Sequence, residues 1–439
     1  EPSKLGLASI YYKIGNFKMA IDLYESLLYQ HKKNYLLHLN LGNCYFKLSK
    51  NKKAIQFYKE AVNIDPNNFQ AYLNIGIIEK IESNYRNAGY FLEKAYKIEA
   101  KNPLLNYHIG DLMFKIKEYK KATEFLKQTI KLDKTNNDAK EKLAHSYLEI
   151  GEDAIAQKVF EELLIDEKDK SKLERLLVNL SSIIIKINGD DFHKDYSLVK
   201  KYAKKALEIN PNNVIALSNI GICYLVEANF PKAISYIENA LNLKPENIKV
   251  LKNSASIYSH IGEYEKAEKI LKKLLEIDPS EQSMSLLLAS SLLSQNKFSE
   301  GWEYYEHRWM KKYGISKPTQ FPNFKKPLWK PNLGYESILI WGEQGLGDQL
   351  LHGSIINDFS NKFKKTSLAI DPRLCDIFKE TFPKINVFSL FENIEQDFFD
   401  YHIPLTSLGY YCRNSINDFL PLKIPYKLSS QNYESSNKK

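Results

Sequence analysis

The sequence has few cysteines and no long apolar segment, and each shortage excludes a class of protein. The 439 residues include only Cys44, Cys223, Cys375 and Cys412. No two of them form a CxxC pair, and no histidine stands at zinc-ligand spacing, so we expect reduced thiols and no metal site. Free thiols are typical of a reducing compartment, here the cytoplasm. No apolar run reaches the roughly 18 residues that cross a bilayer, and no secretory signal is present, so we expect no membrane span.

An excess of one charge is also nearly absent. The chain has 62 basic and 53 acidic residues, a net charge of +9. Lysines alternate with glutamates along amphipathic segments, which is typical of a solvated helix surface. No basic stripe with interleaved aromatic residues is visible, so we do not expect a nucleic-acid partner. The chain begins in the middle of a pattern at Glu1, and we expect that it is a fragment.

Small and aromatic residues recur at a constant interval through the first part of the chain. Gly42, Gly76 and Gly110 are 34 residues apart. Ala54 recurs in the same way at Ala88, Ala122 and Ala156. Apolar residues between these positions follow helical spacing, so each unit predicts two amphipathic helices that stack on their neighbours. The predicted units are 1–34, 35–68, 69–102, 103–136, 137–170, an irregular 171–213, 214–247, 248–281 and a degenerate 282–312.

This pattern resembles the tetratricopeptide repeat (TPR), which implies a mainly α, superhelical solenoid that binds a polypeptide partner in its concave groove. Two residues before the repeat glycine, four units carry an asparagine: Asn40, Asn74, Asn219 and Asn253. A similar asparagine row lines the groove of the eukaryotic protein O-GlcNAc transferases, and an amide pairs with any peptide backbone. The alternative is that these amides only cap or hydrate a helix surface.

The composition changes after the repeats. Residues 313–336 are rich in proline and predict an ordered connector rather than a helix. Residues 337–428 alternate short apolar strands, at 337–341, 367–370, 386–389 and 400–405, with predicted helices at 350–363 and 373–381. This alternation favours a parallel sheet, the beginning of a Rossmann-like α/β domain. Residues 429–439 form a polar tail.

A glycine-rich turn follows the first predicted strand and is a candidate ligand loop. It includes Glu343, Gln344, Gly345, Gly347, Asp348 and Gln349. The turn lacks the lysine of a P-loop, and Leu350 stands where a dinucleotide fingerprint needs glycine. What remains is a tight turn that presents backbone amides and a helix N-terminus to a ligand, with Asp348 at or near the N-cap.

The order of motifs from Gly301 to Leu405 resembles bacterial TPR proteins fused to a heptosyltransferase-like (family 9) glycosyltransferase of GT-B architecture. The resemblance implies a nucleotide-sugar donor and makes Asp348 the candidate base that deprotonates the acceptor hydroxyl. His402, at the end of a predicted strand, is a weaker catalytic candidate and is equally interpretable as structural. GT-B enzymes hold the donor in a C-terminal half, which we do not find here. We therefore expect a protein-interaction scaffold attached to an inactive partial domain; the alternative is a transferase active only with the missing half.

Overall fold

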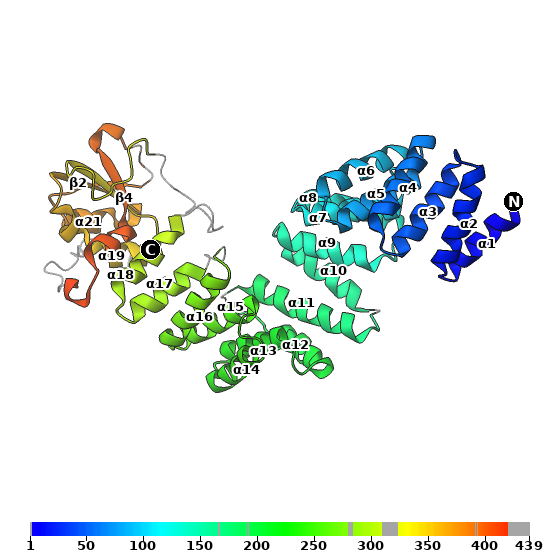
Figure 1. Ribbon diagram of the computed structural model, residues 1–439. Helices are drawn as coiled ribbons and strands as arrows, with labels where there is room; N and C mark the ends of the chain where they lie inside the picture. Colours follow the sequence, from blue (N-terminus) through cyan, green and yellow to red (C-terminus); the bar gives the residue numbers. More distant parts are fainter. Residues whose placement is uncertain are drawn as a thin grey trace, which may run out of the picture. The chain divides into compact units, whose positions relative to one another are not determined.

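The computed structural model describes residues 2–165, 167–189, 191, 193–279, 284–309, 324–390, 392 and 394–419 (Figure 1). Parts of three predicted segments lie outside these residues: 313–323 of the connector, 420–428 of the α/β segment and the tail 429–439. The chain divides into two compact units, Glu1–Pro211 and Asn212–Lys439, which are described separately. None of the described helices is both long enough and apolar enough to cross a membrane.

The first unit consists of successive helices that pack in pairs, as expected for a mainly α repeat solenoid (Figure 1). In chain order they are α1 Pro2–Lys13, α2 Phe17–Gln30, α3 Tyr35–Lys47, α4 Asn51–Ile64, α5 Phe69–Ile81, α6 Tyr85–Ile98, α7 Pro103–Lys115, α8 Tyr119–Leu132, α9 Asn137–Glu149, α10 Asp153–Ile165, α11 Lys170–Asn188 and α12 Ser197–Ile209. Helix α11 has 19 residues whereas α9 has 13, so part of the insertion predicted as a loop extends this helix.

The second unit begins with further helix pairs and ends with a small sheet. Its helices are α13 Val214–Val226, α14 Phe230–Leu243, α15 Ile248–His260, α16 Tyr264–Ile277, α17 Ser285–Ser294 and α18 Phe298–Tyr305, followed by the 3₁₀ turn η2 Glu306–Trp309. The neighbouring first helices α13 and α15 pack on each other, as do α15 and α17. This part of the second unit therefore repeats the packing of a helical solenoid.

Close helix contact explains the periodic small residues. A Cβ atom added to Gly42 would lie 2.5 Å from the ring of Tyr58, and one added to Gly76 would lie 2.7 Å from Leu92. Ala54, Ala88 and Ala122 have no exposed surface. Interiors at crystal-like density cannot admit even one extra methyl group without a shift, so these positions set the distance between paired helices.

Asparagines begin the first helices. Their side chains accept hydrogen bonds from the first backbone N–H groups, which have no partner within the helix. These N-caps are Asn34, Asn68, Asn102, Asn136, Asn213 and Asn247. Each of these asparagines ends the turn between two repeats and starts the first helix of the next one.

The turn inside each repeat contains one residue in the left-handed conformation. It is glycine in three repeats and another residue in five: Gly15, Ser49, Ser83, Lys117, Gly151, Ala228, Gly262 and Asn296. The constant position within the repeat shows that the turn geometry is imposed by the helix pair. A side chain at positive φ is strained, and the five non-glycine positions carry that cost.

The C-terminal α/β segment contains a parallel sheet of four strands in the order β3-β2-β1-β4. The strands are β1 Ser337–Trp341, β2 Lys365–Ile370, β3 Asn386–Ser389 and β4 Tyr401–Pro404. Strand β1 pairs with β2 on one side and with β4 on the other. The order reverses between β1 and β4, and open parallel sheets bind ligands beyond the carboxyl ends of their strands at such a reversal.

The helices of this segment differ in detail from the prediction. One helix was expected at 350–363, but the structure has α19 Leu346–Gly353 and α20 Ile356–Ser360. The 3₁₀ turn η4 Pro372–Leu374 precedes α21 Cys375–Thr381. After β4 come the 3₁₀ turn η6 Leu405–Ser407 and α22 Leu408–Cys412. The described part of the predicted connector contributes Trp329, which is buried in the core of this segment.

Candidate functional site

In the first unit, one asparagine of the row, Asn74, is hydrogen-bonded to the preceding repeat. Asn74 on α5 donates its amide hydrogen to Asn43 on α3 at 3.0 Å, and Gln70 donates to the Asn74 oxygen at 2.9 Å. Tyr58 donates to the same Asn43 oxygen at 2.7 Å. Asn40 and Asn74 are both half-buried. These contacts orient the Asn74 amide, which retains a second N–H.

The second unit has a similar arrangement around Asn253. Its amide nitrogen lies 3.0 Å from the hydroxyl of Ser218 and 3.3 Å from the amide oxygen of Asn219. Asn219 is only 2% exposed, whereas Asn253 is half-buried. Asn219 thus serves mainly to hold its neighbour, and Asn253 is the more accessible member of this pair.

Further along the first unit the same repeat position carries His108 and Lys142 in place of asparagine. Lys80 lies 2.9 Å from His108 Nδ1 and forms a buried ion pair with Asp111, and Lys142 pairs with Asp111 at 2.8 Å. Burial, together with the charge of the nearby Lys80, lowers the pKa of His108 to about 4. The histidine is therefore neutral at neutral pH. His108 stands 34 residues after Asn74, so the repeat interval identifies its position. Nothing in the sequence indicated that Lys80 would be its partner.

The glycine-rich turn connects β1 to α19, at the carboxyl edge of the sheet. Gly345 is the N-cap of α19, and Asp348 lies exposed in the first helical turn. Asp348 therefore stands near the N-cap, as expected, although no side chain makes a cap bond there. Gln349 is buried; it donates to the Gln344 carbonyl at 2.8 Å and accepts from the Asp371 amide at 3.0 Å. Gly347 is exposed beside Asp348.

A buried polar network joins this turn to the end of the helical repeats. The Glu343 side chain is 1% exposed; one of its oxygens accepts a hydrogen bond from Thr406 and lies 3.4 Å from Arg308. Arg308, from η2, also donates to Thr406 at 2.9 Å and Ser407 at 2.7 Å and pairs with Glu306. Burial raises the pKa of Glu343 above its ordinary value, although Arg308 opposes the shift. The turn is therefore held from η2 and from η6.

His402 lies in the core of the sheet rather than in the loop region. It is 4% exposed, and its Nδ1 accepts a hydrogen bond from the Trp341 indole at 3.1 Å. Phe324 packs against the imidazole, with ring centroids 4.9 Å apart. Burial lowers the pKa of His402 to about 4. A neutral imidazole enclosed by aromatic rings suits the structural interpretation better than the catalytic one.

In the part of the chain that the structure describes, no group of three or more histidine, cysteine, aspartate or glutamate side chains has the arrangement to hold a metal ion. The four cysteines are free thiols, and burial raises the pKa of Cys44 to about 11. Such a thiol is almost wholly protonated at neutral pH and is a poor nucleophile.

Comparison with known proteins identifies the repeats. Models of the tetratricopeptide repeat match residues 5–35, 35–68 and 227–291. The protein FlbA of Caulobacter vibrioides is 32% identical over 108 residues, which are 24% of this chain and 18% of FlbA. The chain therefore aligns with less than a fifth of that relative.

Three solved structures are also similar. YrrB, described as a TPR protein with an unusual peptide-binding site, is 18% identical over 52% of this chain and 96% of its own, with a TM-score of 0.33. The C-terminal part of a TPR protein from Cytophaga hutchinsonii is 17% identical over 57% and 98%, with a TM-score of 0.47. A chain of the APC/C Cut9–Hcn1 hetero-tetramer is 15% identical over 69% and 57%, with a TM-score of 0.43. The family matches and the recurring helix pairs together show that this chain carries tetratricopeptide repeats.

Proposed function

We propose that the protein is an interaction scaffold that binds extended polypeptide through the asparagines of its first helices. The observation that carries this proposal is the oriented amide of Asn74, which is bonded to Asn43 of the preceding repeat and keeps an N–H for a ligand. Asn253 is held by a different bond, to Asn219 of the preceding repeat, and keeps its carbonyl oxygen. An amide held in place by a neighbour pairs with a peptide backbone at a lower entropic cost than a freely rotating one.

The test compares two sets of asparagine variants. Peptides selected for binding from a random library are titrated against the protein by fluorescence anisotropy. Replacing Asn40, Asn74 and Asn253 by alanine should weaken binding by about tenfold or more, because each unit then loses amides that pair with a peptide backbone. The control replaces three exposed asparagines of second helices, Asn63, Asn87 and Asn242. Equal affinity of the two variants, at equal melting temperature, would refute the proposal.

A second candidate function is sugar transfer, with the α/β segment as the acceptor-binding half of a GT-B enzyme. Its support is the glycine-rich turn at the reversal of strand order, with the exposed Asp348 available to take a proton from an acceptor hydroxyl. The donor, a nucleotide sugar, would be held by a second α/β half. In the protein with that half present, Asp348→Asn should abolish transfer of labelled sugar, whereas Asp376→Asn, an exposed carboxylate on α21, should not. Undiminished transfer by Asp348→Asn would remove Asp348 as the base.

A further inference from the structure

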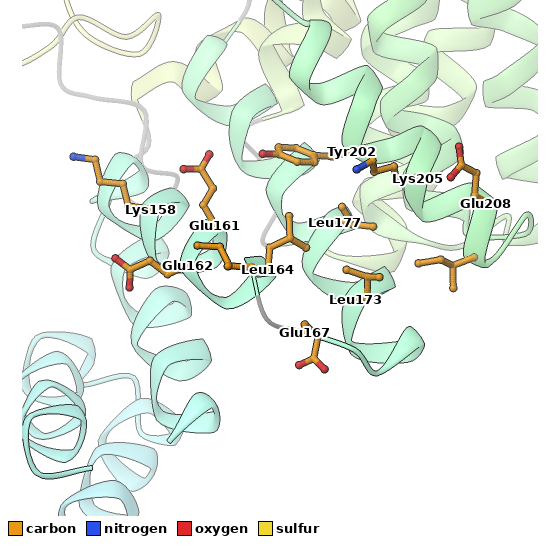
Figure 2. Close-up of a pocket in the computed structure, with 12 residues that line it drawn as sticks. Lys158, Glu161, Glu162, Leu164, Glu167, Leu173, Leu177, Tyr202, Lys205 and Glu208 are labelled. Carbon is orange, nitrogen blue, oxygen red and sulfur yellow. The ribbon is translucent and has the colours of Figure 1, made fainter. Parts of the chain in front are cut away.

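A groove lies between the irregular repeat of the first unit and α10, the last helix of the preceding repeat. Figure 2 shows α10 and α12 as its two walls, with α11 between them. The volume is about 960 Å³. Twelve residues line it: Lys158, Glu161, Glu162, Leu164, Ile165, Glu167, Leu173, Leu177, Tyr202, Lys205, Glu208 and Ile209. This volume is at the upper end of the range for sites that bind small ligands, so a short stretch of polypeptide fits.

The groove lies in the repeat whose first helix is lengthened, at the end where α11 begins and where α10 and α12 finish. Helix α11 has 19 residues, whereas α9 has 13. The walls are second helices, whereas the asparagine row lies on first helices. The groove is therefore a separate surface from the one considered above.

The interior of the groove is aliphatic and partly uncovered. Ile165 at the end of α10 is 78% exposed, and Leu164, Leu173 and Ile209 are half-buried. Leu177 of α11 forms a buried floor. Covering aliphatic surface contributes about 25 cal/mol per Å², so an apolar side chain placed in the groove gains free energy of binding.

The rim of the groove is acidic on a chain that is basic overall. Four glutamates and two lysines line it, whereas the whole chain has a net charge of +9. In the described part of the chain, neither Glu162 on α10 nor Glu208 on α12 has a hydrogen bond or ion pair. Figure 2 shows these two carboxylates on opposite walls. Such a rim favours a partner with positive charges beside its apolar residues.

We propose that this groove binds a basic amphipathic segment of a partner polypeptide. Its aliphatic side chains would cover Ile165 and Leu173, and its lysines or arginines would pair with Glu162 and Glu208. Helices α10, α11 and α12 would thereby give the scaffold a second binding surface. This binding does not depend on the asparagine row.

The probe is a short fluorescein-labelled helical peptide with leucines along one face and lysines on the others. We expect the wild-type protein to bind it, and the double variant Glu162→Lys/Glu208→Lys to bind it at least about tenfold more weakly. Ile165→Ser tests the apolar part; because Ile165 is 78% exposed, this change leaves folding intact and should weaken binding severalfold. The variant lacking Asn40, Asn74 and Asn253 should bind the probe normally.

The control is Glu60→Lys/Glu124→Lys, which reverses two exposed carboxylates on α4 and α8. An equal loss of affinity in the control would mean that the peptide responds only to overall charge, and it would overturn the proposal. Equal binding of a probe with glutamates in place of the lysines would do the same. So would unchanged binding by both the Glu162→Lys/Glu208→Lys and the Ile165→Ser variants.

Discussion

The helical repeats and the α/β segment are stabilised by contacts of different kinds. In the repeats, one contact recurs: Gly42 meets Tyr58, and Gly76 meets Leu92, sixteen positions later in each case. In the α/β segment each important contact occurs once and joins distant parts of the chain. Arg308 reaches Thr406, and Trp302 donates to the Arg413 carbonyl at 2.8 Å. A change in a repeat should therefore act locally, whereas a change at Arg308 should affect a whole segment.

The largest effect is expected for Arg308→Ala. It leaves the Glu343 carboxylate 1% exposed without its cation, and an unpaired buried charge costs about 3–5 kcal/mol. Hydrogen exchange of β1 and β4 should accelerate strongly, while exchange in α5 and α6 stays unchanged. Adding Glu343→Gln should restore part of the lost protection, because the amide carries no charge. If the amides of β1 exchange as slowly as in the wild type, the hydrogen-bond network around Arg308 does not stabilise the α/β segment.

Gly42→Ala should have a smaller and more local effect. Its new methyl group would overlap the Tyr58 ring, and overpacking of a core typically costs about 1–3 kcal/mol. Gly6→Ala is the matched control, since a Cβ there meets nothing within 4 Å and alanine favours a helix by up to about 1 kcal/mol. Urea unfolding should show a lower midpoint for the first variant only. Two equal midpoints would contradict the packing argument.

Acid should destabilise the repeat that contains His108. The folded pKa of this histidine is about 4, below the ordinary 6.5, so the unfolded chain binds the proton more readily. The stability of the neutral form is complete above pH 6.5 and declines as the pH falls toward 4. Between pH 7 and pH 5 the wild type should lose about 1–2 kcal/mol more than His108→Asn, which carries the residue found at this position in the preceding repeat, Asn74. Parallel pH profiles of urea unfolding would exclude this role.

The smallest expected effect concerns the turn inside the repeat. Ala228 has φ 53°, where glycine is free of strain, so Ala228→Gly should stabilise the protein by about 0.5–1 kcal/mol. Gly262 occupies the same position one repeat later with φ 83°, and Gly262→Ala should destabilise by a similar amount. Melting temperatures that move in the same direction for both variants would contradict the conclusion that a side chain at this turn position is strained.

Much of the helical architecture could be predicted because its contacts lie close together in the sequence. Gly42, Ala54 and Tyr58 fall within one repeat, so their spacing alone indicates which residues pack. Gly15, Gly151 and Gly262 stand at the same position of their repeats. This recurrence of glycine could have predicted a turn residue with positive φ. The break between α19 and α20 was not predicted, because the apolar pattern across Leu350–Phe363 does not show where one helix ends and the next begins. The glycosyltransferase interpretation of Gly342–Gln349 stays a prediction.

By itself, the sequence determined that paired helices stack in repeats, since side-chain volume at a fixed interval leaves one way to bury each helix face. It also placed Glu343 between the first strand and the helix that follows, but Asp348, expected in the same turn, lies in the first turn of α19. Only the tertiary structure decided that Glu343 is buried against Arg308 while Asp348 is exposed, that His402 is enclosed by aromatic rings, and that α10, α11 and α12 leave a groove. Each of these features depends on a contact that occurs only once and joins residues far apart in the sequence. A periodic sequence pattern cannot indicate such contacts.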